Sequence, residues 1–309
     1  MKKTLIALAA VAAVSAASAQ VTVYGKADVG IKNSGATTVA SGVYEGSRLG
    51  FKGTTDLGSG LKGSFQLEGG VDLVAGTLAG FNRVATVGVS GAFGTVTVGR
   101  QWSLYDGVIY YMDAMEYNGF SSVNALWNDD VGNTGGGNVA GSIQYATPSM
   151  GGFSAQIIAA PNNTTVAGYG NYTGYGLMYA QGPLNVVLAT QSYETSATTT
   201  SKSVGIAGSY DLGAVVLYAG NTTTAITNGR QSNGSTFGVK LPMGQSYVTV
   251  GAATNKDTTA GVDTNTTAYA AQYIYNWNKQ AVIYVGYNSK TAGSAAAVNT
   301  SGAGVRYNF

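Results

Sequence analysis

The residue types that perform most covalent and metal chemistry are missing from this sequence. Its 309 residues include no cysteine and no histidine. Without cysteine there is no disulfide, thiol nucleophile or iron–sulfur cluster. Without histidine there is no Ser-His-Asp triad and no HExxH zinc site. We therefore expect no metal, no cofactor and no enzyme activity, although a hydrolase with a carboxylate pair stays compatible with the composition.

Charge is scarce as well. Only 10% of the residues are Asp, Glu, Lys or Arg, against about 25% in an ordinary soluble domain. The net charge of +2 gives no electrostatic footprint for nucleic acid. The 45% hydrophobic content argues against disorder.

The first nineteen residues have the three regions of a secretory signal peptide. Lys2 and Lys3 are basic, residues 5–14 are apolar, and Ala17-Ser18-Ala19 matches a cleavage site. The apolar run is too short for a membrane anchor. We expect residues 1–19 to be removed and the mature chain to be one domain, 20–309.

The mature chain alternates between apolar and polar residues with a period of two, which predicts strand after strand. In the last nine residues, Val305, Tyr307 and Phe309 share one face, and Arg306 and Asn308 share the other. The pattern predicts sixteen strands, at 21–31, 44–54, 60–70, 81–90, 94–101, 138–147, 151–159, 171–181, 184–192, 202–211, 214–222, 234–242, 245–253, 267–276, 280–288 and 301–309. Short turns alternate with longer loops, which are expected at 32–43, 71–80, 102–137, 160–170, 193–201, 223–233, 254–266 and 289–300.

An even number of strands of about ten residues, with short turns on one side and long loops on the other, is typical of a transmembrane β-barrel. The barrel must close because lipid cannot satisfy an open sheet edge. Its lipid-facing half explains the charge deficit, and the 21 tyrosines suit interfacial girdles. A soluble β-sandwich also alternates, but one sandwich seldom uses sixteen strands. Sixteen strands leave an aqueous lumen.

Several segments resemble the general porins of Gram-negative bacteria, most closely the β-proteobacterial type. They are Val21-Thr22-Val23-Tyr24-Gly25, Ser47-Arg48-Leu49-Gly50-Phe51-Lys52-Gly53, residues 56–62, Phe65-Gln66-Leu67-Glu68, Phe81-Asn82-Arg83, residues 93–101, Tyr145-Ala146-Thr147-Pro148 and Arg306-Tyr307-Asn308-Phe309.

The resemblance implies an all-β, sixteen-stranded barrel in the cell outer membrane. It also implies a homotrimer, and a third long loop, here 102–137, that folds into the lumen. Tyr307 and Phe309 are similar to the family's outer-membrane signal for the barrel-assembly machinery. The implied function is passive diffusion of ions and small hydrophilic solutes, with no nucleic-acid partner.

The same resemblance implies a constriction with opposing charges, which bias the ions that pass. Arg48 has lumen parity, whereas Arg83 and Arg100 depend on the resemblance. The basic side is expected to hold Arg48, Arg83 and Arg100, and the acidic side Glu68, Asp106, Asp113 and Glu116. The alternative for each arginine is a structural ion pair with a neighbouring carboxylate.

One position departs from the family pattern. Relatives often carry a further arginine where this chain has Asn138. We therefore expect mild ion selectivity and leave its sign open. A substrate-specific outer-membrane channel is the alternative function, and a surface adhesin or phage-receptor barrel is a more distant one.

Overall fold

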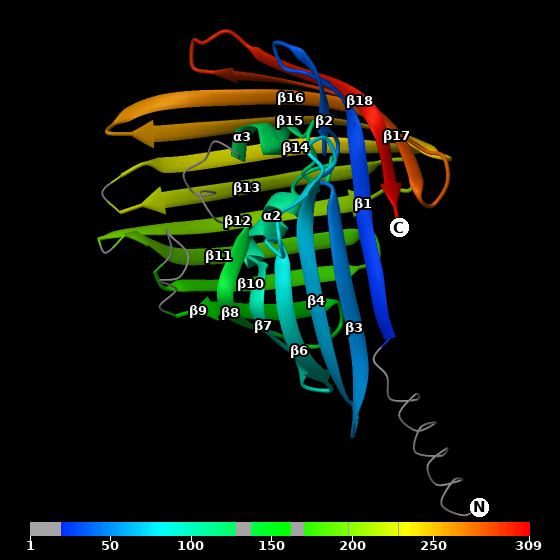
Figure 1. Cartoon of the computed structure of the whole chain (residues 1–309). Coiled ribbons are helices and arrows are strands. Elements are labelled where there is room, and N and C mark those ends of the chain that lie inside the picture. The colour runs from blue at the N-terminus through cyan, green and yellow to red at the C-terminus, as the bar shows by residue number, and fades with distance from the viewer. Residues whose placement is uncertain (1–19, 128–136, 162–169, 197, 228) are drawn as a thin grey trace, which may run out of the picture.

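The chain forms one closed antiparallel sheet wrapped into a barrel (Figure 1). The structure, a computed structural model, describes residues 20–127, 137–161, 170–196, 198–227 and 229–309. The signal peptide predicted at 1–19 lies outside the described residues.

Sixteen strands build the wall, and two short strands, β2 (Thr37–Ser41) and β5 (Thr77–Leu78), belong to hairpins at one rim. The wall strands are β1 (Gln20–Asn33), β3 (Arg48–Gly58), β4 (Leu61–Asp72), β6 (Val84–Gly91), β7 (Gly94–Trp102), β8 (Asn138–Ala146), β9 (Phe153–Ala160), β10 (Tyr172–Gln181), β11 (Leu184–Ser196), β12 (Thr199–Asp211), β13 (Val216–Ile226), β14 (Gln231–Met243), β15 (Ser246–Thr259), β16 (Val262–Asn276), β17 (Ala281–Ala292) and β18 (Val298–Asn308). The predicted sixteen-stranded barrel is confirmed.

The barrel closes where β1 and β18 meet. Residues 26–33 of β1 pair with residues 301–308 of β18, while residues 20–26 pair with β3. Beyond β18, the amide and carbonyl of Phe309 both bond to Gly25, at 3.1 and 2.9 Å. The final residue is therefore part of the closing seam.

The two faces of the wall carry opposite chemistry. Outside, Val21, Val23 and Ile31 of β1 are all more than half exposed. Inside, Ser203, Thr249 and Gln272 are almost completely buried. Such a surface suits lipid outside and a polar interior. Among the described residues, no helix is long and apolar enough to cross a membrane.

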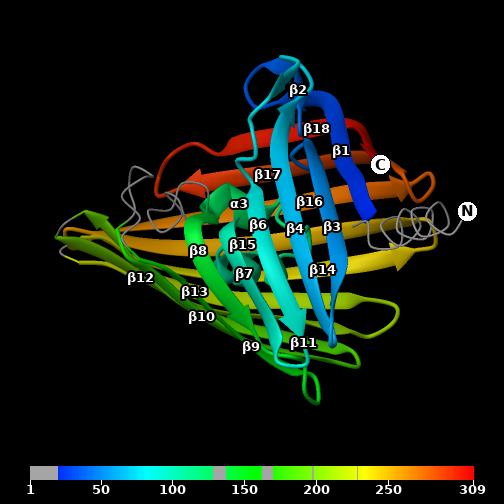
Figure 2. The ribbon, with the colours of Figure 1, turned by 60° about the horizontal axis from the view of Figure 1, so that its bottom comes forward.

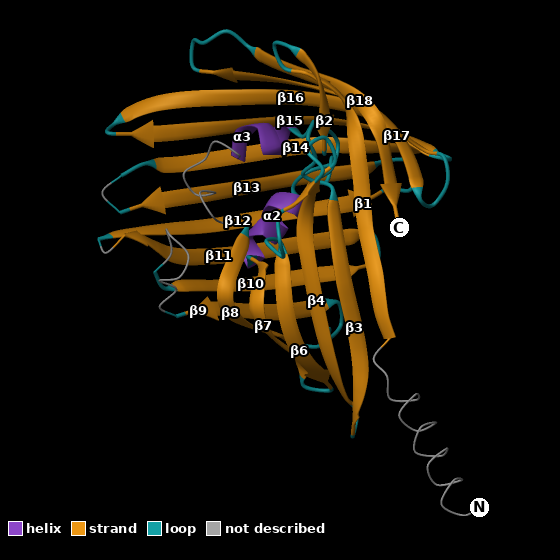
Figure 3. Ribbon diagram, viewed as in Figure 1, coloured by secondary structure: helices purple, strands orange, loops and turns teal. Residues whose placement is uncertain are grey.

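Two helices, α2 (Leu104–Tyr111) and α3 (Ser122–Trp127), lie within the ring of strands (Figures 2 and 3). Both belong to the third loop, which follows β7, so the loop predicted at 102–137 lies inside the barrel over its described part. Residues 128–136 of that loop lie outside the described residues.

Four of the expected long loops are wrong. Strands continue into 193–201, 223–233, 254–266 and 289–300. β16 has 15 residues, about 50 Å of strand, which exceeds an apolar band of about 25 Å even when tilted. These Thr- and Asn-rich segments are polar because they extend beyond the hydrocarbon layer, and they keep their strand pairing there.

Candidate functional site

The third loop is held against one side of the lumen wall by an apolar core. In α2, Ser103 caps the helix by accepting the Asp106 amide at 3.0 Å. Val108 and Met112 are fully buried, and they pack with Val187 and Ala207 of the wall. This contact fixes α2 to the inner face of the wall.

The third loop packs closely against glycines of the wall. A Cβ on Gly220 of β13 would lie 2.4 Å from the Cβ of Met112, and one on Gly286 of β17 would lie 2.3 Å from the Phe120 ring. No side chain fits at these distances, so glycine lets the loop lie flat on the sheet.

The tip of the loop is built around Asp113, which is 2% exposed. Its carboxylate accepts the amides of Met115 at 3.0 Å and Tyr117 at 2.7 Å. Burial raises the pKa of Asp113 to about 6. This geometry corrects the expectation that Asp113 faces the solute, because its carboxylate holds the tip together and is closed off from the lumen.

A second segment, Gly42–Ser47, also turns into the lumen. Asp28 of β1 accepts the amides of Tyr44 and Glu45, at 3.2 and 3.3 Å, and the Tyr284 hydroxyl at 2.9 Å. The Tyr44 carbonyl in turn accepts the amide of Gly119, at 2.8 Å, so this segment contacts the third loop. The predicted strand 44–54 therefore begins later, at Arg48, because residues 42–47 leave the sheet to make these bonds.

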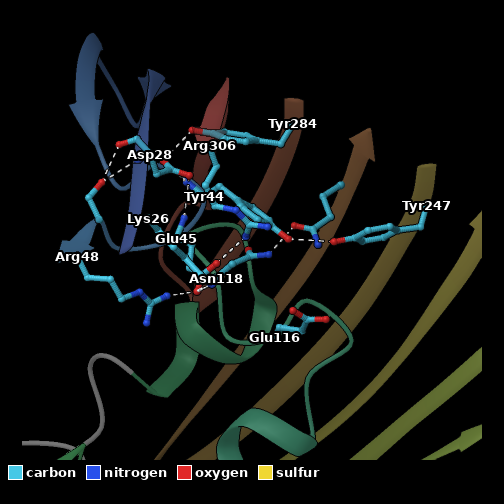
Figure 4. Close-up of polar contacts among 12 residues, drawn as sticks. Lys26, Asp28, Tyr44, Glu45, Arg48, Glu116, Asn118, Tyr247, Tyr284 and Arg306 are labelled. Atoms are coloured by element: carbon cyan, nitrogen blue, oxygen red, sulfur yellow. Dashed lines mark hydrogen bonds and ion pairs between the residues drawn. The ribbon is translucent and has the colours of Figure 1, made fainter. Parts of the chain in front are cut away.

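This segment places Glu45 among three cations, which we call the basic nest: Lys26 of β1, Arg48 of β3 and Arg306 of β18 (Figure 4). Oε1 of Glu45 lies 2.5 Å from Lys26 Nζ, and Oε2 lies 2.5 Å from Arg306 Nη1. Arg48 also pairs with Oε1. Burial alone would raise the pKa of Glu45, but Lys26, Arg48 and Arg306 outweigh it and lower that pKa.

A second ion-pair group lies beside the nest. Glu68 of β4 lies 2.6 Å from Arg83 Nε and 3.9 Å from Arg48 Nη1. The Arg83 guanidinium covers the Trp102 ring at 5.1 Å. Arg48, Glu68 and Trp102 border a cavity of about 470 Å³ that continues under α2. The structure thus puts Glu68 among the basic residues, which corrects its expected place on the opposite side.

The remaining loop acids differ from each other. Glu116 has an exposed carboxylate 3.4 Å from Lys240 Nζ, and Lys240 lies over the Tyr247 ring at 4.2 Å. Asp106 is half-buried, and burial raises its pKa to about 7 against the opposing charge of Arg83.

Arg100 lies apart from these groups. It pairs across the sheet with Ala85, on the face of β7 that carries Val98, and Val98 is 49% exposed. Its Nε donates to the Asn82 carbonyl at 2.5 Å. The strand parity therefore corrects the expectation that Arg100 lines the constriction.

The sequence reasoning also missed residues that the structure brings together: Lys26, Asp28, Glu45 and Arg306. The lumen parity of Lys26 and Arg306 was visible in the alternation. Glu45 was not recognisable, because its segment was read as strand. Asn138 donates to the Arg83 carbonyl at 2.7 Å, so this side chain bonds to the backbone of Arg83 and adds no cation of its own. In the described part of the chain, no group of three His, Cys, Asp or Glu side chains could hold a metal ion.

A family model described as "Gram-negative porin" matches residues 4–297. The chain belongs to the Gram-negative porin family. This porin is 33% identical to outer membrane porin protein 32 of Delftia acidovorans over 246 residues, which cover 70% of this chain and 68% of that protein. It is 31% identical to an outer membrane porin protein of Bordetella pertussis over 315 residues, covering 83% of this chain and 78% of the relative.

Solved structures agree with the fold of the porin. An anion-selective porin from Comamonas acidovorans superposes with a TM-score of 0.82 at 23% identity, covering 94% of this chain and all of that one. Salmonella typhi OmpF, in complex with daunomycin, gives 0.78 at 19% identity, with 94% and 97% covered. The family and the fold are those of a diffusion channel of the outer membrane.

Proposed function

We propose that this porin is a passive channel for ions and small hydrophilic solutes, with charged side chains at a loop-narrowed constriction that give it mild selectivity. The observation that carries this proposal is the inward-folded third loop, with Arg48 and Glu68 lining the cavity under α2 and Arg83 paired with Glu68. The half-buried Asp106 and the exposed Glu116 add acidic groups from the loop itself.

The charged side chains at the constriction act on ions that pass through the water of the pore at short distance. A fixed charge in a narrow aqueous pore raises the local concentration of oppositely charged ions and lowers that of like ions. Because Arg48 and Arg83 are each paired with a carboxylate, the fields of these charges partly cancel. The net effect on a passing ion is therefore small, which is the physical reason for mild selectivity.

Two further features belong to the proposal. Residues 1–19 act as a signal peptide, and the first residue after them, Gln20, begins β1. The working form is a homotrimer: the in-vitro folded OmpT of Vibrio cholerae, similar in fold with a TM-score of 0.74, is described as a trimer form.

Liposome swelling tests the function. Vesicles that contain refolded protein are diluted into isotonic solutions of neutral sugars of increasing size. A general pore admits each sugar at a rate that falls smoothly with its size. Uptake of one sugar that saturates at low concentration would indicate a substrate-specific channel instead, and no swelling with any solute would contradict the proposal.

A further inference from the structure

The basic nest has the geometry of an anion site that is already filled. Three cations from β1, β3 and β18 converge on the two oxygens of one carboxylate, which belongs to Glu45. Ammonium and guanidinium groups arranged in this way are the usual ligands of carboxylate and phosphate. The side chain of Glu45 keeps 26% of its surface exposed, so the site opens to the lumen.

The nest also has more donors than Glu45 can use. A lysine offers three N–H donors and an arginine five, whereas one carboxylate has two oxygens. The Nε atoms of both Arg48 and Arg306 are buried without a hydrogen-bond partner among the described residues. Glu45 therefore does not saturate the donors of the two guanidinium groups.

Glu45 reaches the nest because its own segment is tethered there. The carboxylate of Asp28 holds the amides of Tyr44 and Glu45, and the Ser47 hydroxyl accepts the Asp28 amide at 2.9 Å. A group held on such a short tether competes with free ligands at a high effective concentration.

We propose that Lys26, Arg48 and Arg306 form a binding site for one carboxylate or phosphate group of a passing solute, and that Glu45 competes for this site as a tethered carboxylate. Glu45 thereby keeps the anion preference of the porin low. The inference rests on the proposed channel function, and it assigns to Glu45 the part of specificity-determining residue.

The opposing loop acid provides a contrast within the same chain. Glu116 pairs with one cation, Lys240, and its side chain is 45% exposed. Removing its charge frees one well-solvated lysine. Removing the charge of Glu45 takes away the carboxylate shared by three cations that are pre-positioned around one point, of which Arg48 keeps a second contact, with Glu68 at 3.9 Å. The two changes therefore have different consequences for anions.

The test is the reversal potential of Glu45→Gln in a potassium chloride gradient across a planar bilayer, with Glu116→Gln as the matched control. Glu45→Gln keeps the size of the side chain and removes its charge. One unit charge about 4 Å away in water corresponds to about a five-fold change in an equilibrium. We expect the chloride-to-potassium permeability ratio to rise about five-fold in Glu45→Gln and less than half as much in Glu116→Gln.

Inorganic phosphate then probes the site directly. In potassium phosphate, the conductance of Glu45→Gln should saturate at a lower concentration than that of the wild type, because the competing carboxylate is gone. A selectivity change no larger than that of Glu116→Gln, or equal saturation in the two proteins, would overturn the inference.

A second variant covers the case in which Glu45→Gln does not insert. Glu45→Asp keeps the charge on a side chain one methylene shorter, which cannot reach all three cations. It should shift selectivity partway toward anions, and an unchanged ratio would count against the competition. A wild type without conductance would refute the channel function, whereas conducting variants without selectivity changes would refute the inference alone.

Discussion

Carboxylates pair with the cations Arg48 and Arg83 of the lumen wall. A substitution at one of these residues therefore also changes the environment of its partner. Arg48 contacts both Glu45 and Glu68, and Arg83 contacts Glu68. These pairs are largely buried, because Arg48 keeps 16% and Glu68 8% of the side-chain surface exposed. Removing one partner therefore leaves a poorly solvated charge behind, which costs more stability than breaking an exposed pair, and it also changes the field that a passing ion meets.

Reversing one of these charges should change ion selectivity. Arg48→Glu places a third carboxylate beside Glu45 and Glu68, so we expect the reversal potential in a salt gradient to move toward cation preference. Lys279→Glu, in an exposed turn at the far rim, makes the same charge change away from the constriction. Equal shifts in both variants would show that Arg48 does not act at the narrow part of the pore.

Asp106 makes the selectivity depend on pH. Its pKa lies near 7 because burial disfavours the charged carboxylate. Lowering the pH from 8 to 6.5 protonates much of Asp106 and removes negative charge from the lumen, so the reversal potential should move toward anions. Asp106→Asn should lose most of this change and behave at pH 8 as the wild type does at low pH. If the variant keeps the full pH response, another group is titrating.

The sequence alone could predict the lumen position of some residues of the site. The lumen parity of Arg48 and Glu68 follows from a two-residue repeat, which any strand imposes. Glu45 could not be predicted, because its position depends on Asp28 and Tyr284, 17 and 239 residues away in the chain. The place of Arg100 could not be predicted from alternation, because the sequence around it leaves the strand parity open and only the resemblance put it at the constriction.

Among the elements, the third loop is positioned by the wall more than by its own sequence. α2 has eight residues and α3 six, which is too short for a stable isolated helix. Their apolar side chains pack on alanines and glycines of the strands behind them. The small residues of the wall therefore define where the loop can lie.

A single added methyl group should displace this loop. In Gly220→Ala the new Cβ would lie 2.4 Å from the Met112 Cβ, which cannot swing away as a side-chain end could. Overpacking of this kind costs about 1–3 kcal/mol. We expect lower unfolding stability in detergent and a lower conductance, because α2 is pushed toward the lumen axis.

The control for this substitution is Gly176→Ala on β10. Its new Cβ would meet Leu104 Cδ1 at 3.4 Å, which is ordinary contact. Stability and conductance should stay close to wild type there. Equal behaviour of the two alanine variants would mean that the wall glycines do not set the position of the loop.

The strands could be predicted better than the connections between them. Alternation fixes where a strand crosses lipid, because one face must be apolar there. Above the membrane both faces meet water, so the period-two signal fades in segments such as 254–266 although the backbone pairing between β15 and β16 continues.

At the scale of the whole molecule, the barrel wall separates lipid on its outer face from water in its lumen. Val21, Val23 and Ile31 are exposed on the outer face, where burial in lipid contributes about 25 cal/mol per Å² of apolar surface. The polar lumen stays in water. The third loop, which folds inward, then sets the width of the aqueous path between the two sides of the membrane.

The most direct measurement is single-channel conductance of the refolded mature porin in a planar lipid bilayer, beside a variant in which a short Gly-Ser linker replaces residues 104–126. We expect discrete openings that scale with salt concentration, and a larger step in the variant, because the linker leaves the lumen wide. Inserted protein without openings, or the same step size in both proteins, would contradict a water-filled barrel narrowed by its third loop.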